Sequence, residues 1–95
     1  MEIDKSDIVR SANGRDAGKV FFVCETDGEY AMIADGKSRR LEKPKRKKKK
    51  HLTLVAKAES RVALKIQSGE KVSNGDIRKA LAIFMAGGDE AEGGM

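Results

Sequence analysis

Short apolar runs separated by turn dipeptides fill the first half of the chain. Three of these runs are each followed by an Asn-Gly or Asp-Gly pair, and they lie at residues 7–12, 19–26 and 30–34. Such dipeptides tolerate the positive φ of a tight turn, while β-branched and aromatic side chains are enriched in strands. The pattern predicts three antiparallel strands, followed by a fourth at residues 38–42 and a fifth at residues 51–56. Short strands with regularly spaced turns are typical of a small antiparallel sheet or barrel.

In the second half of the chain, the apolar residues take the spacing of a helix. A short helix is predicted over residues 59–67, because its apolar residues fall at i, i+1 and i+4 and Gly69 supplies a stop. A second helix is predicted to begin after Ser73 or Asn74 and to end before the pair Gly87-Gly88. The fold class expected from both halves is mostly β with C-terminal α.

One face of the second predicted helix is apolar. The residues recur at i, i+3, i+4, i+7 and i+8, and they are Ile77, Ala80, Leu81, Phe84 and Met85. We expect this face to pack against the sheet, and docking on a partner protein is the alternative. Residues 87–95 are acidic and glycine-rich, and a disordered tail is expected there.

Length and composition are those of a single domain. The chain has 95 residues, of which 39% are hydrophobic and 37% are charged, and its mean hydropathy is −0.55. A chain of this size buries only part of its surface, so its core and its solvent face must be sharply segregated. We expect residues 1–57 to form the β part with a basic loop at residues 37–51, and residues 58–86 to form a helical extension of the same domain.

The sequence lacks the usual signals for a membrane or secretory protein. No run approaches the length of about 20 apolar residues that a bilayer span needs, and the acidic N-terminus does not resemble a signal peptide. The lone Cys24 cannot form an intramolecular disulfide, which fits a reducing compartment. A cytoplasmic protein without a membrane partner is therefore expected.

Positive charge is concentrated in one segment. The formal net charge is +5 and the sequence pI is about 9.5. Residues 37–50 contain ten lysines and arginines and a single acid, Glu42, whereas acids outnumber bases in the remainder. A focused positive patch attracts polyanions and releases counterions when it meets phosphates. Nucleic acid is therefore the leading partner class, and a solvated charge run is the alternative.

The basic segment is predicted to be a loop or a strand rim whose ends are held by the fold. It would join the strands at residues 38–42 and 51–56, and Pro44 suits a loop or a sheet edge. Like charges held so close together repel one another, and a polyphosphate would relieve that repulsion. Arginines can make planar bidentate phosphate contacts, whereas lysines act as point charges. The candidate RNA-binding residues in this segment are Lys37, Arg39, Arg40, Lys43, Lys45, Arg46, Lys47, Lys48, Lys49 and Lys50.

His51 follows this segment and is a further candidate. Its imidazole can hydrogen-bond a phosphate or a base, and the alternative is a structural role at the start of the last strand.

Three stretches of the sequence resemble a known family. The segment GRDAGKV at residues 14–20 resembles the KOW motif of small SH3-like barrels in ribosomal and transcription-associated proteins. The ordered stretches GRDAGKVFFV, ADGKSRRLEKPKRKKKKHL and SNGDIRKAL are similar to small bacterial KOW-domain RNA-binding proteins. These are related to the archaeal and eukaryotic large-subunit ribosomal protein L fourteen-e, and the similarity covers most of the chain. The sequence departs from the motif at Phe21 and Phe22, where many KOW segments have a small residue.

The resemblance implies a small SH3-like β-barrel, a KOW domain, followed by one or two short helices. It also implies RNA as the partner, ribosomal RNA first, in a ribosome- or translation-associated protein, with ribosomal proteins as further partners. Lys19 starts the strand after the motif loop, and the resemblance favours its contact with a phosphate, whereas the sequence alone indicates a solvated lysine. Gly14 and Gly18 bracket that loop and supply the φ that other residues resist. Asp16 is expected to bond to nearby loop amides, and direct RNA contact is the alternative.

The aromatic content bears on the kind of nucleic acid. Aromatic residues make up 4% of the chain, tryptophan is absent, and Tyr30 is the only tyrosine. Phe21, Phe22 and Phe84 lie in apolar contexts and are expected in the core. Single-strand binders present aromatic platforms for base stacking, so structured RNA bound through its shape, phosphates and 2′-hydroxyls is favoured.

Catalysis is not expected. One histidine and one cysteine cannot complete a His-Cys metal site, so neither a metal nor a cofactor is predicted, and Cys24 in an apolar strand is expected to be an inert thiol. The main rival function is a protein-interaction KOW module of the transcription or translation machinery. The run PKRKKKK also matches a nuclear localisation pattern, and binding to anionic membranes is disfavoured because the run contains no apolar anchor. The sequence makes no prediction of the oligomeric state.

Overall fold

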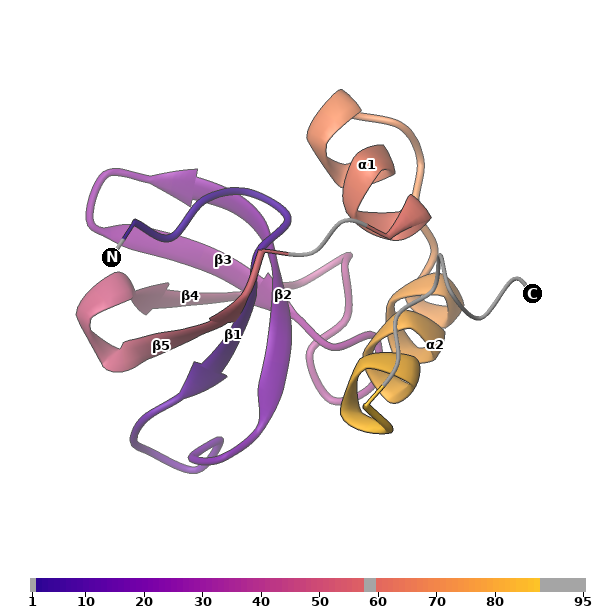
Figure 1. The fold of residues 1–95 in the computed structure, drawn as a ribbon. Coiled ribbons are helices and arrows are strands. Elements are labelled where there is room, and N and C mark those ends of the chain that lie inside the picture. Colours follow the sequence, from indigo (N-terminus) through magenta and orange to yellow (C-terminus); the bar gives the residue numbers. More distant parts are fainter. Residues whose placement is uncertain (1, 58–59, 88–95) are drawn as a thin grey trace.

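A computed structural model, which describes residues 2–57 and 60–87, shows a five-stranded antiparallel sheet followed by two helices (Figure 1). The prediction of a mostly β fold with C-terminal α is confirmed. The elements are β1 (Ile8–Ser11), β2 (Val20–Asp27), β3 (Tyr30–Ala34), β4 (Lys45–Lys48), the 3-10 helix η1 (Lys49–His51), β5 (Leu52–Ala56), α1 (Arg61–Ser68) and α2 (Asn74–Met85). The strand order in the sheet is β4-β3-β2-β1-β5.

Four of the five predicted strands are confirmed, and the fourth is wrong. Residues 38–42 form bends and a turn, and the fourth strand lies instead at Lys45–Lys48, inside the basic run. The reason is local hydrogen bonding. The carboxylate of Asp35 accepts bonds from the amides of Lys37 and Arg39, at 2.9 and 2.8 Å, and the Arg39 carbonyl accepts from the amides of Asp35 and Gly36. These backbone groups are therefore satisfied within a compact loop, and the chain becomes extended only beyond it.

The central strand β2 is apolar on both faces. Phe21 and Phe22 are exposed by only 0% and 1%, and they point to opposite sides of the sheet because side chains alternate along a strand. Phe22 lies opposite Ile8 and faces the helices, while Phe21 lies opposite Val9 and faces a second cluster formed by sheet residues and Ile3. The prediction of a core position is confirmed for these two phenylalanines, whereas the third, Phe84, is only partly buried and packs against the cluster that contains Phe22.

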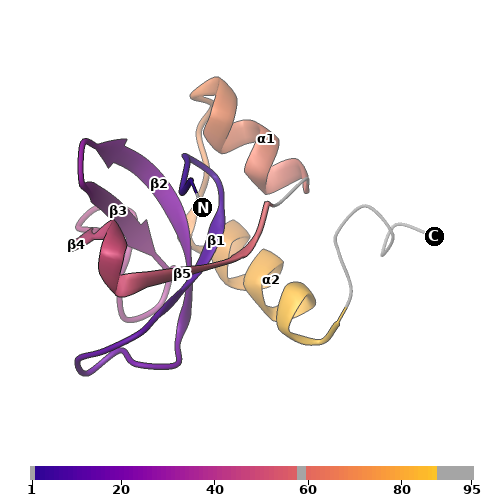
Figure 2. The same cartoon turned by 60° about the vertical axis from the view of Figure 1, so that its left-hand side comes forward.

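The sheet is strongly curled. Strands β4 and β5 are at opposite edges of the strand order, and a flat sheet would place them about 19 Å apart, yet only the three residues of η1 join them. A 3-10 turn advances about 2 Å per residue, so the sheet must bend until its two edges lie on the same side of the molecule. Figures 1 and 2 show β4 and β5 side by side at the η1 turn.

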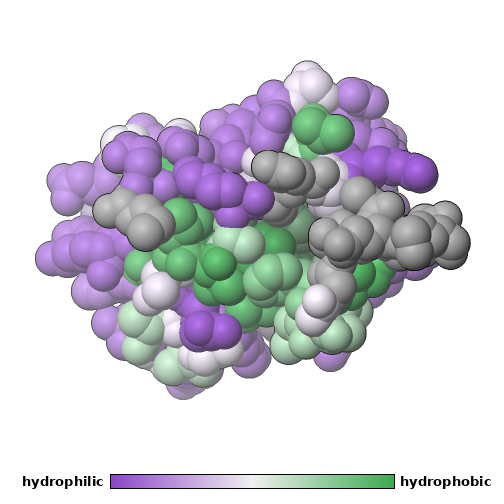
Figure 3. Space-filling view, in the orientation of Figure 1, coloured by the Kyte–Doolittle hydropathy of each residue, from purple (hydrophilic) through white to green (hydrophobic). Residues whose placement is uncertain are grey.

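The two helices cover the outer face of the sheet, and both begin at a serine cap. The Ser60 side chain accepts a hydrogen bond from the amide of Ala63, and Ser73 forms a reciprocal capping box with Asp76. Helix α1 ends at Gly69, which has a φ of +80°, as predicted. The hydrophobic residues visible in Figure 3 gather where the helices meet the sheet, and hydrophilic residues surround them.

The apolar face of α2 packs on the sheet, as predicted, along most of its length. Ile77, Ala80 and Leu81 are buried in the same cluster as Phe22, whereas Met85 at the end of the helix is 69% exposed. The prediction of a disordered tail concerns residues that, beyond Gly87, lie outside the described part of the chain. Neither described helix has the length and apolar content needed to cross a membrane.

Candidate nucleic-acid interface

The basic run forms an edge strand whose side chains alternate between two faces. Lys45 and Lys47 pair with Ile33 and Ala31, which are fully buried in the inner cluster. Directly opposite residues of a ladder lie on the same face, so these two lysines point toward the inside of the curl. Arg46 and Lys48 point outward. The predicted basic loop is thus a strand over residues 45–48, which fixes the directions of its side chains.

The inward-pointing Lys45 ends on a buried carboxylate. Its Nζ lies 3.0 Å from Oδ2 of Asp16, in the loop at residues 12–19, and the Asp16 side chain is only 7% exposed. Nη2 of Arg39 lies 3.7 Å from the same oxygen, and Nζ of Lys19 lies 4.0 Å from Oδ1. Three sequence-predicted cations therefore converge on one anion, which leaves a local excess of two positive charges.

The environment of Asp16 keeps its carboxylate ionised. The hydrogen bond from Lys45 is the main cause that holds the pKa of Asp16 below its ordinary value, and the charges of Lys45, Arg39 and Lys19 act in the same direction. Burial opposes this shift, because it disfavours the charged form. The expectation that Asp16 serves only as a turn former is therefore incomplete, since it is also the counterion of the cations above it.

Lys47 fastens β4 to the same loop. Its Nζ donates hydrogen bonds to Oγ of Ser11 at 2.7 Å and to the carbonyl of Asn13 at 2.9 Å. Nδ2 of Asn13 lies 3.1 Å from Nδ1 of His51, so the histidine is tied to this loop through one ring nitrogen. Gly14, with a φ of +81°, lies beside the Lys47 ammonium, and the predicted need for glycine in this loop is confirmed.

On the outer face of β4, Arg46 stacks on the single tyrosine. Its Cζ lies 3.6 Å from the centre of the Tyr30 ring, a distance typical of a cation–π contact. Lys48 lies opposite Tyr30 in the register and extends the positive outer face. The backbone amide of Lys49 donates to the carbonyl of Glu29 at 2.7 Å, which fixes the start of the 3-10 turn.

Helix α2 holds the loop at residues 35–44, which carries the remaining predicted cations Lys37, Arg40 and Lys43. The side chain of Asn74 accepts from the amide of Leu41 at 2.8 Å and donates to Glu42 at 2.6 Å, while Arg78 donates to the carbonyl of Gly36 at 2.6 Å. A side chain at Gly36 would collide with the carbonyl oxygen of Asn74, and the φ there is +76°. The helix therefore serves as a support for the basic loop.

Most of the predicted cations form no ion pair with the described residues. Of the ten lysines and arginines between residues 37 and 50, only Arg39 and Lys45 lie within 4.0 Å of a carboxylate of residues 2–57 or 60–87. The loop also contains a depression of about 370 Å³ that is lined by Ser38, Arg39, Arg40, Glu42, Lys43 and Pro44. Except at Arg39, which pairs with Asp16, this part of the surface can therefore attract a polyanion without first breaking an ion pair among the described residues.

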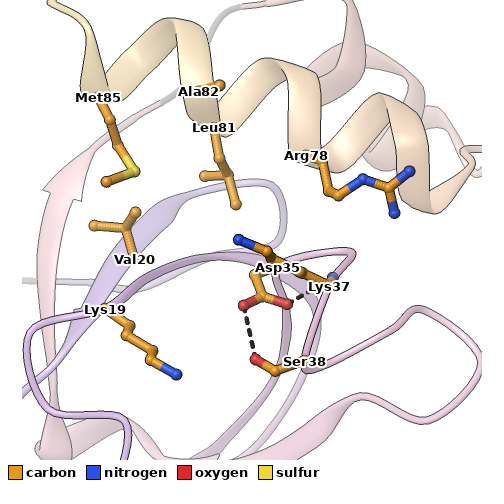
Figure 4. A pocket seen from close by; sticks show the side chains of 9 residues that line it. All are labelled: Lys19, Val20, Asp35, Lys37, Ser38, Arg78, Leu81, Ala82 and Met85. Carbon is orange, nitrogen blue, oxygen red and sulfur yellow. Dashed lines mark hydrogen bonds between the residues drawn. The ribbon is translucent and has the colours of Figure 1, made fainter.

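A larger groove lies between α2 and the loop at residues 35–38 (Figure 4). It has a volume of about 700 Å³, and Val20, Leu81 and Met85 form apolar walls. Lys19 and Lys37 lie at its border. The groove therefore adjoins the cations around Asp16, but its walls are apolar rather than charged.

The structure also locates the groups that bear on catalysis. Cys24 is the extra residue at a bulge of β2 and is half-buried, and burial raises the pKa of its thiol to about 11. At neutral pH this thiol is protonated and therefore a poor nucleophile. Among the described residues, no group of three or more His, Cys, Asp or Glu side chains is placed to hold a metal ion.

Sequence reasoning missed the roles of Asp16, Ser11 and Asn13. Their contacts to Lys45 and Lys47 span 29 to 36 positions in the sequence, so no local pattern reports them. The only available signal was an acid between two glycines in a basic protein.

No family model matches the chain, and no curated protein matches it significantly.

Proposed function

We propose that this protein is a non-catalytic RNA-binding protein that contacts the phosphates of structured RNA, with ribosomal RNA as the first candidate in a ribosome- or translation-associated role. We also propose that the curled sheet is an SH3-like barrel of the KOW family. The proximity of β4 and β5 and the motif GRDAGKV at residues 14–20 support this fold. RNA in the cytoplasm is the partner that fits both the positive charge of residues 37–50 and the resemblance to KOW-domain proteins.

One observation carries the proposed function. Eight of the ten cations in the basic segment have no carboxylate within 4.0 Å among the described residues, although strand β4 and helix α2 hold the backbone of the segment in place. Holding unneutralised cations together costs Coulomb energy, and bound phosphates recover that energy while they release counterions. Arg39, Arg40 and Arg46 would supply planar contacts, and the lysines would supply point charges.

The proposal is tested by measuring the affinity for a structured RNA over a series of salt concentrations. If about five phosphates are engaged, log K should fall with log salt at a slope of about −4. A slope near zero would contradict the proposed mechanism. Sedimentation of the protein with ribosomal subunits then tests the choice of ribosomal RNA.

A matched pair of triple variants locates the contact. Replacing Lys48, Lys49 and Lys50 with glutamine removes three charges at the end of β4 and in η1 that make no ion pair among the described residues. Replacing Lys65, Lys71 and Lys79 with glutamine removes three charges from the helical part. Both variants have the same net charge. The first should weaken binding similarly for all RNA sequences and reduce the magnitude of the salt slope by up to about 3, whereas the second should remain close to the wild type. Equal effects would show that only net charge matters.

A second candidate function is binding to another protein, and the groove beside α2 favours it. Met85 is largely exposed at the wall of this groove, and exposed apolar surface in a concave site often marks an interface. Binding that persists at 1 M salt, where charges are screened beyond about 3 Å, would support this function over RNA binding.

A further inference from the structure

A single buried carboxylate lies beneath three of the cations that we propose for RNA binding. The Asp16 side chain is 7% exposed, whereas the side chains of Lys45, Arg39 and Lys19 are 29%, 39% and 54% exposed. The negative charge is therefore covered, and the positive groups above it remain accessible to solvent. A phosphate approaching this surface meets the cations before it meets the anion.

The three cations come from three different parts of the chain. Lys19 precedes β2, Arg39 belongs to the loop at residues 35–44, and Lys45 begins β4. Each is a long side chain with several rotatable bonds, and like charges repel at this distance. Asp16 is the shared partner that keeps their charged ends together, with two of them on the same oxygen atom, Oδ2.

The loop that carries Asp16 is itself fixed. The amide of Gly18 donates to the carbonyl of Ser11 at 2.9 Å, and the amide of Lys19 donates to the carbonyl of Asp16 at 2.9 Å. Lys47 of β4 adds hydrogen bonds to Ser11 and Asn13. A carboxylate on such a loop provides a defined anchor point. The charged ends that it holds therefore keep a defined spacing before any ligand arrives.

We propose that Asp16 is a positioning residue, which holds Lys19, Arg39 and Lys45 in a preset array that selects the fixed phosphate spacing of structured RNA over flexible polyanions. The inference rests on the proposed RNA binding and specifies its ligand class. Because the three side chains are already ordered, binding does not carry the entropic cost of ordering them. This increases the affinity only for a ligand whose phosphates match the geometry of the array. A flexible polyphosphate adapts to any arrangement of cations and responds mainly to net charge.

The substitution Asp16→Asn separates three possible roles by the sign of the change on two ligands. The ligands are an RNA hairpin and inorganic polyphosphate, and both affinities are measured at one salt concentration. If Asp16 only contributes charge, its loss strengthens both interactions. If it only maintains the fold, both interactions weaken. The positioning role predicts that hairpin binding weakens at least fivefold while polyphosphate binding stays equal or becomes stronger.

The matched control is Asp27→Asn, which makes the same charge change at the last residue of β2, at the opposite end of that strand from Lys19 and the Asp16 cluster. It should strengthen both interactions slightly and leave their ratio unchanged. The inference is overturned if Asp16→Asn changes the ratio of the two affinities no more than Asp27→Asn does. If the wild type binds the hairpin no more tightly than polyphosphate, the proposed selectivity is absent and the inference fails. If the wild type binds no RNA at all, the proposed function itself is overturned.

A charge-conserving variant keeps the test valid if Asp16→Asn does not fold. Arg39→Lys retains the positive charge but loses the planar fork that faces Oδ2 of Asp16. It should weaken hairpin binding about threefold or more and leave polyphosphate binding unchanged. The control Arg10→Lys, at an exposed position of β1, should alter neither affinity. Identical hairpin affinities for Arg39→Lys, Arg10→Lys and the wild type would contradict the inference.

Discussion

Strands β2 and β4 lie in one sheet and share the same alternation of side chains, yet their chemistry is opposite. The central strand β2 places Phe21 on one face and Phe22 on the other, and both are buried. The edge strand β4 directs Lys45 to the inner face and Arg46 to the outer face. The difference shows that a strand which is cationic at every position can still belong to a folded sheet if it lies at the edge.

The inner lysines of β4 explain how the sheet accommodates this strand. Lysine has a long aliphatic stem, which can cover apolar surface while the ammonium reaches a polar environment. In β4 the stems start beside the buried residues Ile33 and Ala31, and the ammonium groups of Lys45 and Lys47 end on Asp16, Ser11 and Asn13. The inward lysines of β4 therefore contribute to the fold as well as to the charged surface, whereas Arg46 and Lys48 form no ion pair among the described residues.

The largest effect on stability is expected in β2. Phe22→Ala would remove a side chain that is 1% exposed and packs between the sheet and both helices. Loss of a buried phenylalanine typically lowers the free energy of unfolding by about 3–5 kcal/mol, because a cavity remains. Urea denaturation followed by circular dichroism measures this change. A loss below about 1 kcal/mol would show that the outer face of β2 is not a packed core.

A smaller effect should separate the two faces of β4. Lys45→Met keeps the aliphatic stem but leaves the buried Asp16 without its closest partner, and we expect a loss of about 1–3 kcal/mol. Lys48→Met removes an outward charge and should change stability by less than about 0.5 kcal/mol. The same denaturation experiment compares the two variants. Equal losses would contradict the division of β4 into an inward structural half and an outward free half.

The smallest effect is expected from acid, and it isolates Asp16. The pKa of this carboxyl is lower in the folded protein than its ordinary value of 3.8, so its stabilising contribution is complete above about pH 4 and is lost as the pH falls through the folded value. The pKa values of Glu42 and Asp76 are also lowered, so their contributions to the stability of the fold are likewise lost as the pH falls. The difference in unfolding free energy between the wild type and Asp16→Asn, measured from pH 6 to pH 2.5, should therefore shrink toward low pH. A difference that does not vary with pH would show that Asp16 is not stabilised in its ionised form.

Local signals in the sequence predicted most of the fold. The turn dipeptides marked the ends of β2 and β3, and the serine cap and apolar spacing marked α2, because each of these signals acts within a few residues. The residues of β4 were predicted to form a loop or a strand rim, since a run of lysines shows no alternation of apolar and polar residues that would define a strand. Its extended conformation depends on pairing with β3, which is a tertiary contact.

The candidate site was predictable in composition but not in organisation. The sequence identified the cations, but it did not show that Lys45 and Lys47 are engaged inside the fold while Lys48 is not. That division follows from the register of β4 against β3 and from a loop that comes about 30 positions earlier. Asp16 could not be assigned its partners Arg39 and Lys45 from the sequence, because only Lys19 is close to it in the chain and the other two meet it through folding.

The outer backbone edge of β4 carries a further consequence. An edge strand offers unpaired amides and carbonyls on which another chain can form a strand, and lysines along such an edge discourage this by mutual repulsion between two approaching copies. That protection is electrostatic, so it weakens when salt screens the charges or when a polyanion neutralises them. Light scattering of the protein during titration with short polyanions should therefore show self-association close to charge balance, and its disappearance when either component is in excess.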